Sequence, residues 1–118
     1  MATIDSLQTL TARLAEFVHE RDWDQFHNPK NLAMALVAEG GELLEHFQWL
    51  SAEEASALTP AQRDEVAMEM ADILMFLVRL ADRLDVDLLD AAGRKLELNR
   101  RKYPVERARG RATKYDKL

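Results

Sequence analysis

Four acidic residues stand in two pairs with a helical spacing. Glu39 and Glu42 are three residues apart, and so are Glu69 and Asp72. On a helix, residues three apart are neighbours on one surface, with roughly 5–6 Å between their Cβ atoms. Like charges this close raise one another's pKa unless a cation lies between them. The two pairs therefore indicate a divalent metal ion held by oxygen ligands.

Both pairs lie beside apolar residues rather than on a fully solvated face. Because a helix advances about 100° per residue, Glu39 lies about 20° from Leu32 and about 40° from Leu43. Glu65 lies one turn before Glu69 on the same line of the next long helix. A carboxylate at the edge of an apolar stripe is costly without a partner, so we expect the two pairs to face a shared interior.

The ligand types favour Mg²⁺, with Mn²⁺ as a substitute, because hard ions prefer carboxylate oxygens. A carboxylate di-iron protein is a lesser alternative: its Glu-x-x-His spacing is missing, and His46 follows Glu42 by four residues. Acids three apart also occur on ordinary solvated helices. A non-catalytic helical scaffold, or a nucleotide-binding module, is therefore the other alternative.

The elements that carry these acids are expected to be helices. Only four Gly and three Pro are present, and no long stretch alternates apolar and polar residues. Apolar periodicity and capping residues predict four helices, at about 6–21, 29–49 and 60–84, and from 86 or 88 to 103. The fold class is all-α, and we expect a four-helix bundle.

The third predicted helix is apolar nearly all round beyond Met68, which indicates burial on several sides. A four-helix domain of this size can hardly cover this helix completely. We therefore expect subunit contacts and a homo-oligomer. A homotetramer built as a dimer of dimers is the expected assembly.

The length and composition indicate one domain, residues 1–118, because 118 residues are too few for two. The absence of cysteine excludes disulfides, thiolate zinc sites, iron–sulfur clusters and a cysteine nucleophile. The longest uncharged apolar run, Ile73–Val78, is far shorter than a membrane span, and no signal-peptide pattern opens the chain. We therefore expect a cytoplasmic protein with no membrane partner.

The charge is unevenly distributed. Residues 1–93 hold 6 basic and 18 acidic side chains, whereas residues 94–118 hold 10 and 3. The segment 104–118 is thus a basic tail on an acidic body. With a pI near 5.2, the chain does not have the basic surface typical of nucleic-acid-binding domains, so we expect no nucleic-acid partner.

The pattern Glu39-x-x-Glu42, a 26-residue gap and Glu69-x-x-Asp72 resembles the MazG-like all-α nucleoside triphosphate pyrophosphohydrolases. Further segments resemble the dCTP pyrophosphatase branch of that family: Glu20–His27, Glu42–Leu43, Phe47–Trp49, Asn99–Arg101 and Tyr103–Pro104.

This resemblance implies an enzyme that cleaves a nucleoside triphosphate between its α and β phosphates, with Mg²⁺. The products are a nucleoside monophosphate and pyrophosphate, and the role is house-cleaning of the nucleotide pool. In the branch that this chain resembles, the substrate is dCTP or a modified dCTP. The resemblance makes Glu39, Glu42, Glu69 and Asp72 the catalytic metal ligands.

The resemblance also implies a set of nucleotide contacts. It assigns Trp23 and Trp49 to a pocket that stacks the base, although large aromatic residues are also common in cores. His27 is a candidate for hydrogen bonding to a pyrimidine edge. Phe76 stands where the branch has a tyrosine, so a hydroxyl near the sugar is missing. The remaining candidates for phosphate, sugar or base contacts are Lys95, Asn99 and Lys114.

Overall fold

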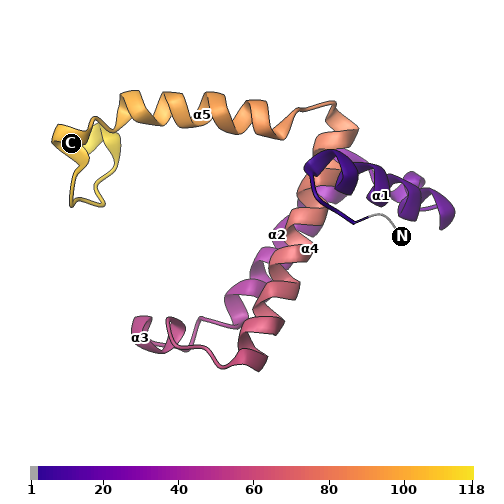
Figure 1. The fold of residues 1–118 in the computed structure, drawn as a ribbon, viewed down its shortest axis with the longest axis horizontal. Helices are drawn as coiled ribbons and strands as arrows, with labels where there is room; N and C mark the ends of the chain where they lie inside the picture. Colours follow the sequence, from indigo (N-terminus) through magenta and orange to yellow (C-terminus); the bar gives the residue numbers. More distant parts are fainter. Residues whose placement is uncertain (1–2) are drawn as a thin grey trace. The chain divides into compact units, whose positions relative to one another are not determined.

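The computed structural model describes residues 3–118, and these residues form helices and connecting segments without a β-strand (Figure 1). The elements in chain order, with η for a short 3-10 helix, are α1 (Leu7–Glu20), η1 (Asp24–Phe26), α2 (Pro29–Glu45), α3 (Ala52–Ala55), α4 (Pro60–Leu84), α5 (Leu88–Lys102), α6 (Val105–Ala108) and η2 (Tyr115–Lys117). The predicted all-helical class is confirmed.

Short-range contacts start α2 where the sequence predicts. Asn28 Oδ1 accepts a hydrogen bond from the Asn31 backbone N–H at 2.9 Å, and Pro29 takes the first helical position. This cap satisfies one of the N–H groups that a helix start leaves free. α2 ends at Glu45, however, rather than near Trp49 as predicted. Beyond Glu45 the backbone closes tighter turns, with hydrogen bonds over three residues, and these end the helix.

A capping box starts α4. The Thr59 hydroxyl accepts from the Gln62 backbone N–H at 3.2 Å, and the Gln62 side chain accepts from the Thr59 backbone N–H at 2.9 Å. These reciprocal bonds satisfy two free donors and hold Pro60 at the first helical position. At the other end Asp85 adopts a left-handed conformation, with φ of 54°, which stops the helix. The predicted range 60–84 is confirmed.

The shortest elements were not predicted. α3 is a single turn that begins with a second capping box between Ser51 and Glu54. Its signal, a serine followed by a glutamate three residues later, is visible in the sequence, but one turn is too short to show an apolar period. α6 and η2 lie in the basic tail, where the same limit applies.

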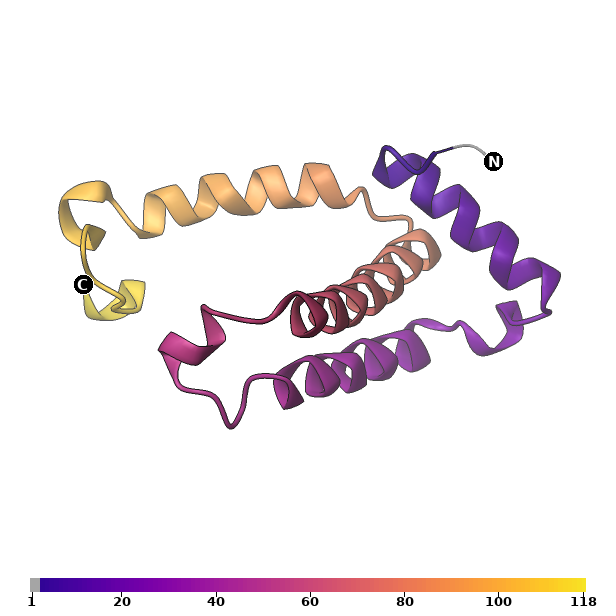
Figure 2. The same ribbon diagram turned by 60° about the horizontal axis from the view of Figure 1, so that its bottom comes forward.

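The chain forms two compact units, one ending at Asp85 and the other spanning Val86–Leu118. In the first unit α2 and α4 lie side by side and run in opposite directions, joined through α3 (Figures 1 and 2). α1 packs against α4. The buried apolar side chains of this unit are those of Leu10, Val18, Leu32, Val66, Val78 and Ala81. The core therefore lies where α4 meets its two neighbours.

α4 keeps several large apolar side chains exposed. Met68 is 58% exposed, Met70 57% and Leu74 42%. α1 and α2 thus cover only part of the helix, in agreement with its apolar character on nearly all sides. A partner subunit on this surface stays a prediction.

The second unit holds α5, α6 and η2. Asp87 caps α5 by accepting from the Asp90 backbone N–H at 3.0 Å, and the helix ends before Tyr103, so the fourth predicted helix is confirmed. The Tyr103 and Tyr115 rings meet edge to face with centroids 6.1 Å apart, and Lys102 Nζ lies 4.7 Å from the Tyr115 ring centroid. A single domain over residues 1–118 stays a prediction. Within the described residues, no helix has the length and hydropathy needed to cross a membrane.

Candidate active site

The packing of α2 against α4 brings carboxylates from both helices together. Oxygen atoms of Glu39, on α2, and of Glu69 and Asp72, on α4, all lie within 4.8 Å of one another. Glu69 and Asp72 are neighbours because they are three residues apart on one helix. Glu39 reaches them only because the two helices lie side by side. The three acids form a cluster, called the carboxylate cluster below, at the α2–α4 interface.

The carboxylate cluster lacks enough hydrogen-bond donors. Glu39 Oε2 and Glu69 Oε2 are buried and have no hydrogen-bond partner among the described residues. The pKa of Glu39 is raised from 4.5 to about 7. Burial is the largest cause, followed by a hydrogen bond with Glu42 and by repulsion from Glu42, Asp72 and Glu69. A cation at this position would neutralise the repulsion between the carboxylates and would give the two unpaired oxygens a partner.

Glu42 lies at the edge of the cluster. Its side chain is exposed, and the closeness of its carboxyl group to that of Glu39 is one of the causes that raise the pKa of Glu39. Loss of the Glu39 proton leaves two neighbouring carboxylates that can bind a cation.

His46 is a neighbour of the cluster that the sequence analysis considered only as an iron ligand. Its Nε2 lies 3.7 Å from Glu69 Oε1, and its Nδ1 lies 4.0 Å from Glu65 Oε2. A signal was available, since His46 follows Glu42 by one helical turn and shares its face of the helix. The imidazole therefore faces the α4 acids across the helix pair.

The two tryptophans lie at opposite ends of α2. Trp23 precedes the helix, is 43% exposed, and meets the Phe17 ring edge to face at 5.8 Å. Trp49 follows the helix and is 86% exposed, so it is not a core residue of the described chain. The 17 residues of α2 span about 25 Å at 1.5 Å each. One chain therefore does not bring Trp23 and Trp49 together.

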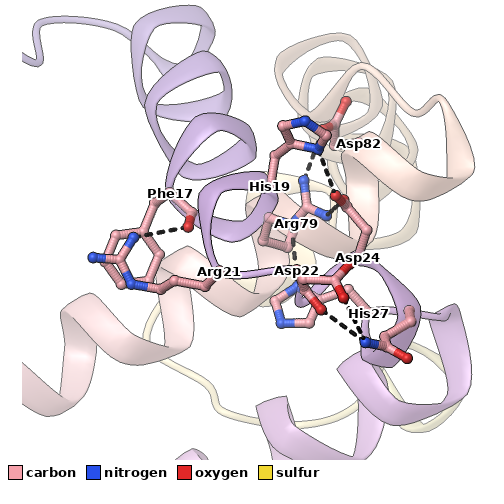
Figure 3. A network of polar contacts seen from close by, with 9 residues as sticks. Phe17, His19, Arg21, Asp22, Asp24, His27, Arg79 and Asp82 are labelled. Atoms are coloured by element: carbon pink, nitrogen blue, oxygen red, sulfur yellow. Dashed lines mark hydrogen bonds and ion pairs between the residues drawn. The ribbon is translucent and has the colours of Figure 1, made fainter.

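A buried arginine, which the sequence analysis missed, forms a second polar site with partners that include the predicted site residue His27 (Figure 3). Arg79 is 4% exposed, and its Nε donates to His27 Nδ1 at 3.3 Å. Its Nη1 donates to Asp82 Oδ2 at 3.1 Å, and its Nη2 lies 3.7 Å from Asp24 Oδ1. Arg79 lies two turns beyond Asp72, on the same side of α4. A charged residue directly after an apolar run was the available signal.

The remaining candidates are distributed over both units. Phe76 is partly exposed and lies one turn beyond Asp72 on α4. Lys95 and Asn99 lie on α5 of the second unit, and the Asn99 backbone carbonyl accepts from the Tyr103 N–H at 2.8 Å. Lys114 is exposed, with its Nζ 6.0 Å from the Tyr115 ring centroid. Their contacts with a nucleotide stay predictions.

Comparison with known proteins shows which family the chain belongs to. The family model of MazG-like proteins matches residues 35–118, which include every member of the carboxylate cluster. The chain belongs to the MazG-like family. It is 49% identical over 115 residues to dCTP pyrophosphatase 1 of Bos taurus and 44% identical to dCTP pyrophosphatase 1 of Homo sapiens. Each alignment covers 96% of this chain and 68% of the mammalian protein.

A solved structure supports the same MazG-like assignment. The crystal structure of a pyrophosphatase from Archaeoglobus fulgidus has a TM-score of 0.80 with this chain at 38% sequence identity. The similarity covers 88% of this chain and 97% of the archaeal chain. The all-helical architecture of this MazG-like protein therefore has an experimental counterpart.

Proposed function

We propose that this MazG-like protein is a Mg²⁺-dependent nucleoside triphosphate pyrophosphohydrolase. It hydrolyses dNTPs between the α and β phosphates, favours dCTP or a modified dCTP, and releases a dNMP and pyrophosphate. The observation that carries the proposal is the carboxylate cluster, with its two unpaired buried oxygens, in a chain so similar to dCTP pyrophosphatases. Clearing unwanted nucleotides from the cytoplasmic pool is the corresponding role.

The residues present fit a hard divalent cation. Every donor in the cluster is a carboxylate oxygen, the ligand type that Mg²⁺ prefers. Glu39 Oε2 and Glu69 Oε2 have no hydrogen-bond partner among residues 3–118, so a cation could bind them without displacing a protein contact. Glu39, Glu42, Glu69 and Asp72 would hold the ion, and Mn²⁺ would fit the same donors. When bound, the ion supplies charge neutralisation on the phosphate oxygens and lowers the pKa of a water.

The hydrolysis needs a group of the protein that accepts a proton from the attacking water. Attack by water on the α-phosphorus forms a new P–O bond, breaks the bond to the bridging oxygen, and releases pyrophosphate with its electron pair. The water must lose a proton, and a carboxylate of the cluster is the nearest class of acceptor. Such an acceptor must be ionised, so the raised pKa of Glu39 makes the protonation state of the cluster important near pH 7.

The base pocket requires a second copy of the chain. Two rings that stack on opposite faces of one base lie about 7 Å apart, because each contact is about 3.5 Å. α2 separates Trp23 and Trp49 of one chain by about 25 Å. If both stack on the same base, Trp23 of one copy and Trp49 of another must meet. The exposed apolar side chains of α4 offer a surface for that assembly.

The function is tested by incubating the purified protein with each common dNTP and NTP plus Mg²⁺, and resolving the products by ion-exchange chromatography. Monophosphate and pyrophosphate, formed fastest from dCTP and abolished by EDTA, support the proposal. Folded protein that turns over no nucleotide refutes it and favours the scaffold or nucleotide-binding alternative.

The shared pocket has its own test. Trp23→Ala and Trp49→Ala homo-oligomers are each expected to bind dCTP weakly. In mixed oligomers, an interface pairing one chain of each kind has one pocket with both tryptophans and one with neither. Recovery of activity on mixing supports a pocket built from two copies. Activity that stays at the mean of the two variants, in oligomers shown to have exchanged chains, refutes it.

Di-iron chemistry is a second candidate, which the position of His46 beside Glu65 and Glu69 favours. Metal analysis of the purified protein distinguishes the two candidates. Stoichiometric iron that resists mild chelation supports the di-iron site, whereas a protein free of iron that Mg²⁺ activates supports the hydrolase.

A further inference from the structure

Arg79 is a buried cation whose partners lie largely on another element. Arginine is almost never fully buried unless it is paired. On its own helix Arg79 contacts Asp82. Across the packed interface it contacts Asp24, the first residue of η1, and His27, which directly follows η1. Asp24 in turn contacts His19 of α1 through Oδ2, at 3.1 Å from His19 Nδ1. Arg79 thus joins α4 to the loop that precedes α2.

The contact with His27 specifies a tautomer. An arginine guanidinium carries donors only, so His27 Nδ1 must accept the hydrogen bond from Arg79 Nε. A neutral imidazole that accepts at Nδ1 carries its hydrogen at Nε2. Protonation of Nδ1 would break this bond and place two cations side by side. The geometry therefore favours a neutral His27 with an N–H group at Nε2.

The charges around His27 act in the same direction. Burial is the largest cause that lowers the pKa of His27, and the Arg79 charge is the second. Asp24 of η1 raises it, and the exposed Arg83 of α4 lowers it. Two further titratable groups lie nearby: Asp82 of α4 contacts Arg79, and His19 of α1 contacts Asp24. His27 thus stays neutral at pH 7.

The loop held by Arg79 is short and carries functional candidates at both ends. Trp23 directly precedes η1, and Asn28, the cap of α2, directly follows His27. A further hydrogen bond, from Asn31 Nδ2 to the Phe26 carbonyl at 3.0 Å, joins the loop to the first turn of α2. Displacement of this loop would therefore shift Trp23 and the start of the helix that carries Glu39.

We propose that Arg79 is a positioning residue for nucleotide binding. It holds the loop Trp23–Asn28 against α4 and keeps His27 as the Nε2–H tautomer, so it determines the position of the base-stacking Trp23 rather than the chemical step. Arg79 touches no reacting atom in this assignment. The nucleotide part of the inference rests on the proposed function, whereas the tautomer and the loop anchor do not.

The first experiment needs no substrate, and it uses a variant only to assign the spectrum. Long-range ¹H–¹⁵N NMR of the folded wild-type protein reports which ring nitrogen of His27 carries hydrogen, and the His27→Gln spectrum identifies the His27 signals. The expected result is a protonated Nε2 and an unprotonated Nδ1 at pH 7. Hydrogen at Nδ1 instead would overturn the proposal, whatever the enzyme's activity.

The second experiment separates binding from chemistry. Arg79→Lys keeps the charge but loses the planar fork of donors. We expect KM for dCTP to rise about tenfold while kcat stays within about threefold, which is loss of binding without loss of transition-state contacts. Arg83→Gln removes a neighbouring charge from an exposed position, and its KM should stay within about twofold of wild type. A fall in kcat with unchanged KM would refute the assignment.

A variant on the loop side covers the case in which Arg79→Lys does not fold. Asp24→Asn removes the loop carboxylate that faces Arg79 and leaves α4 intact. By itself it should also raise KM for dCTP, and unchanged KM would contradict the loop anchor. If Arg79→Lys does fold, the two effects in the double variant should be less than additive, because both act through one contact. Fully additive effects on KM would contradict a shared anchor. If dCTP is not a substrate at all, the NMR result still decides the tautomer, so the two failures are distinguishable.

Discussion

The raised pKa of Glu39 makes the stability of the metal-free protein depend on pH. In the unfolded chain this carboxyl titrates near 4.5, and in the folded protein it titrates near 7. A group whose pKa is raised on folding stabilises the protein in its protonated form, and that contribution is lost as the pH rises from about 4.5 to about 7. In EDTA, the contribution of Glu39 to the stability of the wild type should therefore decrease between pH 5 and pH 8.

The size of the effect follows from the shift. A rise from 4.5 to about 7 corresponds to at most about 3 kcal/mol, at 1.36 kcal/mol per pKa unit. Glu39 is partly exposed, so solvent screening reduces this figure, and we expect about 1 kcal/mol. For a chain of this size, about 1 kcal/mol changes Tm by about 4 °C.

The assay is thermal unfolding in EDTA at pH 5, 6, 7 and 8, for wild type, Glu39→Gln and Glu53→Gln. Glu39→Gln cannot ionise at this position, so its Tm should fall about 4 °C less than that of wild type between pH 5 and pH 8. Glu53→Gln, an exposed change on α3, should follow wild type. Identical pH profiles for wild type and Glu39→Gln would show that the cluster does not repel Glu39, and would refute this reading of the electrostatics.

Three further predictions concern the metal and the reaction. Mg²⁺ should raise Tm more at pH 8 than at pH 6, because the carboxylates must lose protons to bind it, and a calorimetric titration at pH 7 in two buffers should detect release of about half a proton from Glu39. Asp72→Ala should lower kcat/KM by about a hundredfold or more and leave the circular dichroism spectrum unchanged, because a lost ligand removes several kcal/mol of charge stabilisation; activity within about twofold of wild type would exclude Asp72 from the site. The kcat/KM for dCTP at low Mg²⁺ should fall about tenfold per pH unit below about 7, as Glu39 takes up a proton, and a flat profile from pH 5.5 to 8 would contradict it.

The long helices could be predicted because their signals are local. Asn28 with Pro29, and Thr59 with Gln62, satisfy the free N–H groups of the helix starts through bonds that span three residues. The end of α2 was predicted four residues late, since apolar periodicity does not register the tighter turns that begin after Glu45. The one-turn elements, of three or four residues each, were missed because so short a segment cannot show a repeating apolar pattern.

The sequence by itself determined which acids pair within each helix, because residues three apart on a helix are neighbours whatever surrounds them. Only the tertiary structure decided that Glu39 meets Glu69 and Asp72, since this requires α2 and α4 to pack along a particular line. The same holds for Arg79 and His27, which are 52 residues apart in the chain. Helix geometry repeats every few residues, but contacts across so long a separation depend on how whole side-chain surfaces fit together, and no local pattern encodes that fit.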